Sequence, residues 1–508
     1  MWILWGNASV IAIAALASAY AWIYGGTMAQ PLISVIPWIY AILFEVMLVF
    51  PQRHPYESVY DARERVWRRI KRDPLVWVST LLCVLLLVPF FNVGLCQVCD
   101  YPAIMSGANP KPEFSFLPYC VNRMHHLNVV IWFIPVLTAM IAVKHSLTKR
   151  GKRAILSILV WNGVALAVLG FVQQIRVWEA PGPLWSRDSG VENVGTFFST
   201  FGYPNMAGSY FTLLFGLAIA LWRWQVEAVR LENPDDHSGV DRSHRGKFWR
   251  KHFYLIPATL FFLAAFSTLS RAAIMLVSVS AAVYFLHSFV SMLAGRPKAF
   301  KVKTVAVSLL CIGIITFFAY LFTSDAVRRE VETLDTRTVL DRVSGRGQYH
   351  TRVATEIWKK NLFFGCGGWG YKHFCIPNMT EDEFKQIQIV GGINVHNDYL
   401  QFLAEHGLVG FGLMVAAVIL LILPVGSVWR RLARSARFKK PKDLPPKPVA
   451  IFVFPAPAFC VLVAVLAVFI HGFGDCPLRS PAVLSLFFIS LAAVDGFLPK
   501  LDDDEDDI

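Results

Sequence analysis

A histidine–asparagine pair, His396-Asn397, ends a long polar stretch and is followed at once by an apolar segment. Asn397 or the next residue, Asp398, can cap a helix that continues into this segment, which places His396 at the first turn. The positive end of a helix dipole disfavours a protonated imidazole, and a neutral imidazole is what a general base requires. We therefore predict His396 as a catalytic residue and Asn397 as a substrate-binding residue; a purely structural, capping histidine is the alternative.

Three arginines have positions suited to binding phosphate. Arg271 lies in a tight turn between two apolar segments, Arg346 belongs to Ser344-Gly345-Arg346, and Arg352 follows six residues later. Guanidinium groups bind phosphate oxygens in pairs and keep their charge when partly buried. Several of them at one site could hold a diphosphate and stabilise it as a leaving group without a metal. We predict Arg271 and Arg346 as catalytic residues and Arg352 as a substrate-binding residue; ordinary surface arginines are the alternative.

Three more polar residues lie at the ends of apolar segments and complete the predicted substrate-binding set. Asn205 opens one such segment, where it either caps a helix or contacts substrate. Asp475 and Arg479 share a short loop between the last two segments, and their spacing favours an ion pair with each other. Either of them could instead orient His396 or Arg271.

The elements that must position these residues are membrane-spanning helices. The chain has 508 residues, 55% hydrophobic and only 16% charged, and it repeats apolar runs near the length that crosses a bilayer. We predict an all-α polytopic membrane protein of about twelve spans, which is not a β-barrel. The spans lie near residues 3–24, 32–50, 75–95, 126–143, 154–173, 206–226, 253–269, 272–292, 304–323, 407–427, 450–470 and 481–497.

The net charge of +13 is unevenly distributed and does not indicate nucleic acid. More than half of the 48 Lys and Arg residues fall in loops that alternating spans place on one side: 51–74, 144–153, 227–252, 293–303 and 428–449. Positively charged loops are typical of the cytoplasmic side. Both termini are then cytoplasmic, and all the candidate site residues lie on the opposite face.

The predicted organisation has five parts. Residues 1–195 hold the first five spans, 196–323 the next four, 324–406 a sizeable extracytoplasmic loop domain, 407–497 the last three spans, and 498–508 an acidic tail. The first span lacks a basic segment before it, so we expect a retained anchor rather than a cleaved signal peptide. Within 398–410, Glu405 and His406 are expected to dock the helix rather than to do chemistry.

Six cysteines fall on the extracytoplasmic side: Cys96, Cys99, Cys120, Cys366, Cys375 and Cys476. An oxidising compartment allows disulfides among them, with open connectivity. Cys96, Cys99, Cys120 and His125 could instead bind zinc, although a disulfide-stapled loop is favoured. No nucleotide or metalloprotease motif stands in a supporting context. A transporter would place charges near mid-membrane, and the predicted spans contain few, chiefly Glu45 and His287.

Together, the ordered motifs from about residue 195 to 490 resemble those of the O-antigen ligase/polymerase superfamily. The matching segments are Pro204-Asn205, Ser270-Arg271-Ala272-Ala273, Ser344-Gly345-Arg346, Phe364-Gly365-Cys366-Gly367, the His396-Asn397 to Gly407 and Gly410 spacing, and the late His471, Asp475 and Pro481. Two positions depart from the pattern: Tyr349 stands where Trp is frequent, and Ala272 where Gly is common. The first 190 residues contribute only general similarity.

The resemblance implies a membrane glycosyltransferase C-type fold in a bacterial inner membrane, with a periplasmic active site. It implies transfer of a glycan from undecaprenyl diphosphate to an acceptor hydroxyl, with inversion, no cofactor and no metal. His396 would take the hydroxyl proton, and Arg271 and Arg346 would stabilise the departing diphosphate. A ligase acts on lipid A–core, a polymerase extends O-antigen or exopolysaccharide, and a third subgroup glycosylates proteins. The long loop favours polymerases slightly, but the acceptor stays open, and a polysaccharide or lipid transporter is the rival class.

Overall fold

The computed structural model of the protein describes a bundle of helices joined by loops. It describes residues 8–24, 47–54, 56–94, 112, 114–175, 198–232, 249–293, 349–383, 394–438 and 454–499. Within these ranges there is no named strand, only two isolated bridges, Val93 with Cys120 and Phe198 with Phe201. Six of the helices are long and apolar enough to cross a membrane. The predicted all-α, polytopic class is therefore confirmed, and the number of spans stays a prediction.

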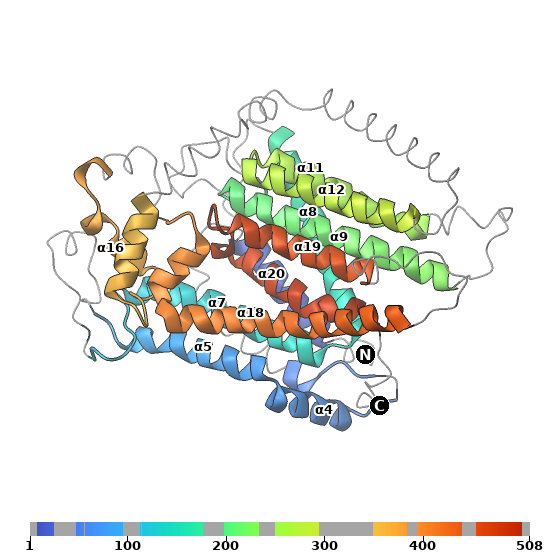
Figure 1. Cartoon of the computed structure of the whole chain (residues 1–508), viewed down its shortest axis with the longest axis horizontal. Helices are drawn as coiled ribbons and strands as arrows, with labels where there is room; N and C mark the ends of the chain where they lie inside the picture. The colour runs from blue at the N-terminus through green and yellow to red at the C-terminus, as the bar shows by residue number, and fades with distance from the viewer. Residues whose placement is uncertain are drawn as a thin grey trace.

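The central helix of the bundle is α9 (Pro204–Glu232), which lies against α8 (Lys149–Ile175), α11 (Leu255–Ser267), α12 (Arg271–Leu293) and α19 (Ala456–His471) (Figure 1). Small residues allow this close packing. A Cβ on Gly208 would overlap Ala273 of α12, and one on Gly216 would overlap Ala464 of α19. The two glycines therefore let α9 approach both neighbouring helices closely.

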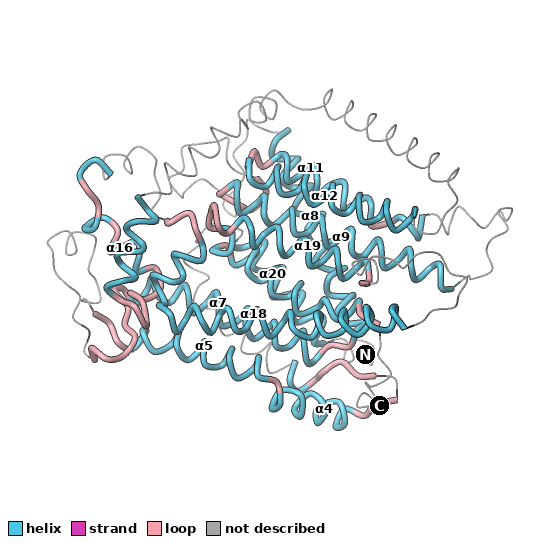
Figure 2. Tube along the Cα trace, viewed as in Figure 1, coloured by secondary structure: helices cyan, strands magenta, loops and turns pink. Residues whose placement is uncertain are grey.

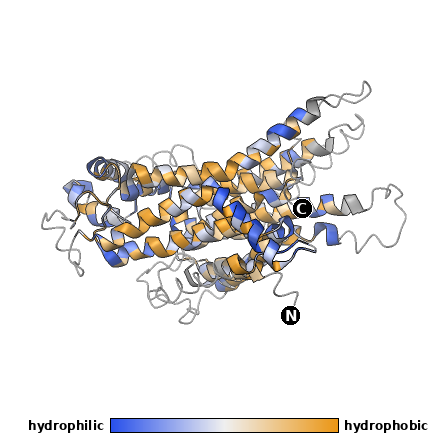
Figure 3. Cartoon of the chain, turned by 90° about the horizontal axis from the view of Figure 1, so that it is seen from below, coloured by the Kyte–Doolittle hydropathy of each residue, from blue (hydrophilic) through white to orange (hydrophobic). Residues whose placement is uncertain are grey.

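A second set of helices lies beside the first. It comprises α5 (Pro74–Phe91), α7 (Arg123–Ser146), α18 (Asp398–Phe438) and α20 (Pro481–Ala493), with α7 against α20 and α5 against α18 (Figure 2). Apolar residues cover the helices along their length, and hydrophilic residues gather toward their ends (Figure 3). This distribution is what a bilayer requires of the spanning segments.

Ten of the predicted spans coincide with described helices, and the spans at 32–50 and 304–323 lie largely or wholly outside the described residues. The first span corresponds to α2 (Ala8–Ala19) and η1 (Tyr20–Tyr24). The helix α18 begins at Asp398, where the predicted cap places its start, and it continues through the predicted span from residue 407. The helical backbone is interrupted at Gly407 (φ 64°, ψ −171°), so the first turns of α18 form a segment separate from the rest of the helix.

A small lobe covers one end of the bundle. Its described part contains a helix over residues 349–360, α16 (Gly370–Phe374) and η3 (Ile376–Asn378). It has an apolar core of its own, which α18 completes: Val353, Ala354, Ile357, Cys366, Tyr371, Cys375, Val395 and Ala404. The lobe lies at the opposite end of the bundle from α4 (Val59–Arg72), the strongly basic helix that precedes α5 (Figure 1).

Two glycines attach this lobe to α18. Gly365 and Gly407 both have positive φ, at 69° and 64°, which glycine adopts without strain. A Cβ on Gly365 would overlap the backbone of Glu405, and a Cβ on Gly407 would overlap the backbone of Phe363. Backbone hydrogen bonds join the same segments, from Cys366 N–H to Ala404 O and from Val409 N–H to Phe363 O. The glycine-rich turn and the break in α18 therefore form one joint.

Candidate active site

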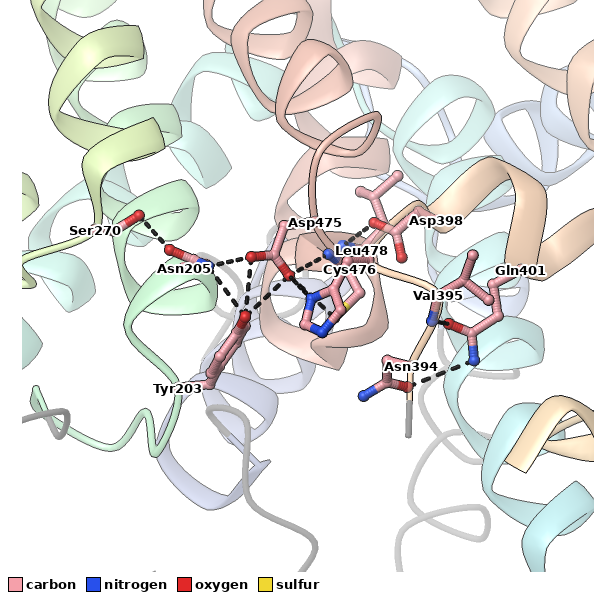
Figure 4. Close-up of polar contacts among 11 residues, drawn as sticks. Tyr203, Asn205, Ser270, Asn394, Val395, Asp398, Gln401, Asp475, Cys476 and Leu478 are labelled. Atoms are coloured by element: carbon pink, nitrogen blue, oxygen red, sulfur yellow. Dashed lines mark hydrogen bonds and ion pairs between the residues drawn. The ribbon is translucent and has the colours of Figure 1, made fainter. Parts of the chain in front are cut away.

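Four chain segments that are distant in sequence meet at the end of the bundle that carries the lobe. They are the start of α9, the start of α12, the start of α18, and the loop between α19 and α20 that contains η5 (Pro477–Arg479). Each segment brings at least one residue that the sequence predicts for the site. Their polar contacts are drawn in Figure 4.

His396 precedes α18 and points toward the α19–α20 loop. Its backbone is left-handed (φ 54°), and Asn397 caps the helix by accepting hydrogen bonds from the backbone N–H groups of Tyr399 and Leu400. Nδ1 of His396 lies 3.3 Å from Oδ1 of Asp475. About a third of the His396 side chain is exposed, against 8% of the Asp475 side chain. Asp475 thus holds the imidazole on its buried side, and the other side of the ring is accessible. The predicted cap at Asn397 is confirmed.

Asp475 is the centre of the network. The hydroxyl of Tyr203 donates to its two oxygens at 2.9 and 3.1 Å, and the amides of Asn205 and Cys476 donate to it as well. Burial raises the pKa of this carboxyl, but the hydrogen bond and charge of His396 and the other donors lower it to about 2. Asp475 is therefore ionised and only accepts hydrogen bonds.

An ionised partner fixes the tautomer of His396. Because the carboxylate can only accept, the proton of the neutral imidazole lies on Nδ1 and the lone pair on Nε2. If Nε2 takes a proton, the negative charge of Asp475 stabilises the resulting imidazolium. The aspartate–histidine pair thus has the arrangement of a general base.

Asn205 connects this pair to α12. Its Oδ1 accepts a hydrogen bond of 2.5 Å from the hydroxyl of Ser270, while its amide donates to Tyr203 and Asp475 (Figure 4). Asn205 does not cap the helix, because α9 already begins at Pro204 and its side chain makes these contacts instead. Ser270 directly precedes Arg271, the first residue of α12. A continuous chain of hydrogen bonds therefore leads from His396 to the residue before Arg271.

The predicted ion pair between Asp475 and Arg479 is wrong. Arg479 lies in the 3-10 turn η5, which directs its guanidinium to the buried carboxylate of Glu405 at 2.7 Å and over the ring of Trp369. Glu405 and His406 are both buried in the bundle, in agreement with the docking role expected of them. Arg479 therefore holds α18 and the lobe to the α19–α20 loop.

Arg352 does not contribute to this network. Arg352 forms ion pairs with Glu383 at 2.5 Å and Glu356 at 2.8 Å, on the surface of the lobe. Arg346 lies outside the described residues. Their roles in binding substrate stay predictions.

Two site residues were not predicted from the sequence. Tyr203 is two residues from Asn205, in the segment Phe201–Asn205. Its hydrogen bond to Asp475 becomes visible only in the folded structure. His350 belongs to the lobe, and its ring centre lies 5.9 Å from that of His396. Neither residue shows a spacing in the sequence that would have indicated this position.

His396, Asp475 and Cys476 place potential ligand atoms within 4.8 Å of one another, close enough for a metal ion. Both Asp475 oxygens already accept hydrogen bonds, and burial raises the pKa of the Cys476 thiol well above its ordinary value. A cation would therefore have to displace existing donors. The alternative zinc set also has other partners: Cys120 contacts Pro89 O, and His125 contacts His373, while Cys96 and Cys99 lie outside the described residues.

An apolar cavity of about 330 Å³ lies between α7, α18, α19 and α20. Its walls are mostly aromatic and aliphatic, with Phe402 and Phe487 among them. Asp398, Glu405 and Arg479 supply polar groups to it. Since Asp398 is two residues from His396, one part of this apolar space lies close to the candidate base.

Comparison with known families finds a match over part of this chain. Residues 256–415 match the family model described as O-antigen ligase. The match covers α11, α12, the lobe and the first half of α18, and therefore Arg271, Arg352 and His396. A search of curated proteins gives no match to this chain. Asn205 and Asp475 lie outside the matched residues; they come from the start of α9 and from the α19–α20 loop.

Proposed function

Since this chain carries an O-antigen ligase domain and belongs to the O-antigen ligase/polymerase superfamily, we propose that it is a glycan transferase of the bacterial inner membrane. It moves a glycan from undecaprenyl diphosphate to an acceptor hydroxyl on the periplasmic face. The observation that carries this proposal is the His396–Asp475 pair, which is linked through Asn205 and Ser270 to the position of Arg271.

In the proposed reaction, Nε2 of His396 takes the proton of the acceptor hydroxyl. The hydroxyl oxygen then bonds to the anomeric carbon of the donor, and the bond from that carbon to the diphosphate oxygen breaks. The diphosphate leaves with the electron pair, and Arg271 and Arg346 stabilise its charge. A single displacement of this kind inverts the anomeric centre. Asp475 holds His396 in the required tautomer and stabilises the imidazolium that forms.

The bilayer delivers the donor in this proposal. An undecaprenyl chain is apolar, and the cavity between α7, α18, α19 and α20 offers an apolar space near His396. The basic helix α4 lies at the opposite end of the bundle from the lobe, which supports a periplasmic site and cytoplasmic termini by the positive-inside rule. A solvent-accessible His396 at a bundle end, rather than at mid-membrane, favours transfer over transport.

A transfer assay tests the proposal and separates its acceptors. Purified protein in liposomes receives undecaprenyl-diphosphate glycan, with lipid A–core or with no added acceptor. Glycan on lipid A–core identifies a ligase, and ladders of longer lipid-linked glycan identify a polymerase. His396→Ala and Arg271→Ala should abolish either product, and a chelator should leave both unchanged. Full activity of His396→Ala would refute the general-base role, and a product with retained anomeric configuration would refute the single displacement.

A further inference from the structure

The lobe places a second histidine beside the candidate base. His350 lies near the start of the helix over residues 349–360, and the residue is only 2% exposed. Its ring centre is 5.9 Å from that of His396, and the two rings are tilted by 60°. Its Nδ1 lies 2.7 Å from the hydroxyl oxygen of Tyr371, a residue of the lobe core. The lobe thus holds an imidazole rigidly at the edge of the site.

His350 is uncharged near neutral pH. Burial, together with the charge of His396, lowers the pKa of His350 to about 4. Two neighbouring imidazoles in the site therefore have different surroundings: His396 has an ionised carboxylate beside it, whereas His350 has a neutral phenol. Of these two imidazoles, His396 is the one with a hydrogen-bonded carboxylate among the described residues, and this carboxylate would stabilise a proton taken from substrate. The more distant charge of Glu383 raises the pKa of His350 less than burial and the charge of His396 lower it.

The phenol also determines which nitrogen of His350 carries the proton. Burial raises the pKa of Tyr371, so its hydroxyl keeps its proton. Among the described residues, this hydroxyl contacts Nδ1 of His350 as its hydrogen-bond acceptor. The phenol therefore donates to Nδ1, and the imidazole proton lies on Nε2. This Nε2–H group has no hydrogen-bond partner among the residues that the structure describes.

We propose that Nε2–H of His350 binds an oxygen of the acceptor sugar, next to the hydroxyl that His396 deprotonates. The proposal rests on the proposed transferase function for the identity of the acceptor. A neutral donor is suited to a neutral hydroxyl or ring oxygen, whereas the diphosphate is bound by guanidinium groups. Because His350 holds the neighbouring oxygen, the attacking hydroxyl is aligned with His396. His350 is therefore a substrate-binding residue that selects which acceptor hydroxyl reacts.

Acceptor affinity is the quantity that tests this proposal. The wild type, His350→Phe and His350→Gln are compared for lipid A–core binding by thermophoresis without donor, and for KM and kcat in the transfer assay. Phenylalanine removes the donor, while glutamine offers an N–H group at a similar reach. Loss of one uncharged hydrogen bond predicts about a tenfold weaker acceptor affinity in His350→Phe, with most of it restored in His350→Gln. The KM of the lipid-linked donor should not change. If the protein is a polymerase, the lipid-linked glycan serves as the acceptor probe.

His373→Phe is the matched control, because His373 is another buried histidine of the lobe, paired with His125 instead of the site. It should bind the acceptor as the wild type does. Equal acceptor affinity in His350→Phe and the wild type overturns the proposal, and so does equal loss in His350→Phe and His373→Phe. If the wild type binds acceptor but transfers nothing, the proposed transferase function is refuted. The acceptor affinities of the His350 variants then still decide whether His350 binds the acceptor. A wild type that binds neither acceptor overturns both.

Discussion

Replacement of Asp475 by asparagine tests the part of the mechanism that the geometry defines best. The substitution keeps the size of the side chain and removes one charge. The new side-chain amide would also offer an N–H group to His396, which favours the tautomer with the proton on Nε2, and that tautomer cannot act as a base at Nε2. We therefore expect a lower kcat for Asp475→Asn, with little change in substrate binding.

The magnitude follows from the distance. Opposite charges 3.3 Å apart attract by about 5 kcal/mol at an effective dielectric constant of about 20. Because a third of His396 is exposed, solvent screens part of this attraction, and about 2–4 kcal/mol remains for the transition state. By transition-state theory this corresponds to a fall in kcat of about 30-fold to 1,000-fold.

Asp73→Asn provides a matched control. Asp73 also contacts a histidine, His145, at 2.9 Å, but it caps α5 at the other end of the bundle. Both variants are purified, their thermal stability in detergent is compared with the wild type, and their kcat is measured at saturating donor and acceptor. Asp73→Asn should stay within about threefold of the wild type. A kcat for Asp475→Asn inside the same range would refute the assignment of Asp475 as the partner of the base.

Three further predictions concern stability. Gly407→Ala should lower the free energy of unfolding by about 3 kcal/mol, visible as a lower Tm, because a Cβ there meets the Phe363 backbone at positive φ. Arg479→Met should cost about 3–5 kcal/mol by leaving the Glu405 carboxylate buried and unpaired, and adding Glu405→Leu should recover part of the lost Tm. Burial lowers the pKa of His350 from 6.5 to about 4, so its contribution to the free energy of unfolding is complete above pH 6.5 and falls by up to about 3 kcal/mol toward pH 4. Hydrogen exchange of residues 349–383 should therefore accelerate as the pH falls over that range, and it should accelerate less in His350→Phe.

The spanning helices and the cap before α18 were predictable because their signals are local. A run of apolar residues near bilayer length defines a span without knowledge of its neighbours. Asn397 has a short side chain that reaches the amides two and three residues later, so its role depends only on the adjacent backbone. The start of α18 at Asp398 follows from the same cap, whereas the break at Gly407 was not predicted, because it depends on the contact of this glycine with the Phe363 backbone.

The pairing within the site was not predictable, because it depends on the direction of side chains from different segments. A spacing of four residues suggests that Asp475 and Arg479 meet, and they would do so on one regular helix. The chain instead turns through Pro477 in a 3-10 segment, and the two side chains leave in different directions. Asp475 then meets His396, and Arg479 meets Glu405. No pattern within the loop itself distinguishes these partners.

Gly365 and Gly407 form a joint that connects the fold with the chemistry. Gly407 lies at the break in α18, and Gly365 lies at the start of the glycine-rich turn of the lobe. The backbone of the lobe occupies the space that a Cβ on Gly407 would need, and the backbone of α18 occupies the space that a Cβ on Gly365 would need. This joint fixes the lobe to the segment that begins directly after His396. His350 belongs to the lobe and His396 to the start of α18, so their separation of 5.9 Å depends on the joint. The spacing from histidine to glycine therefore positions the two imidazoles relative to each other.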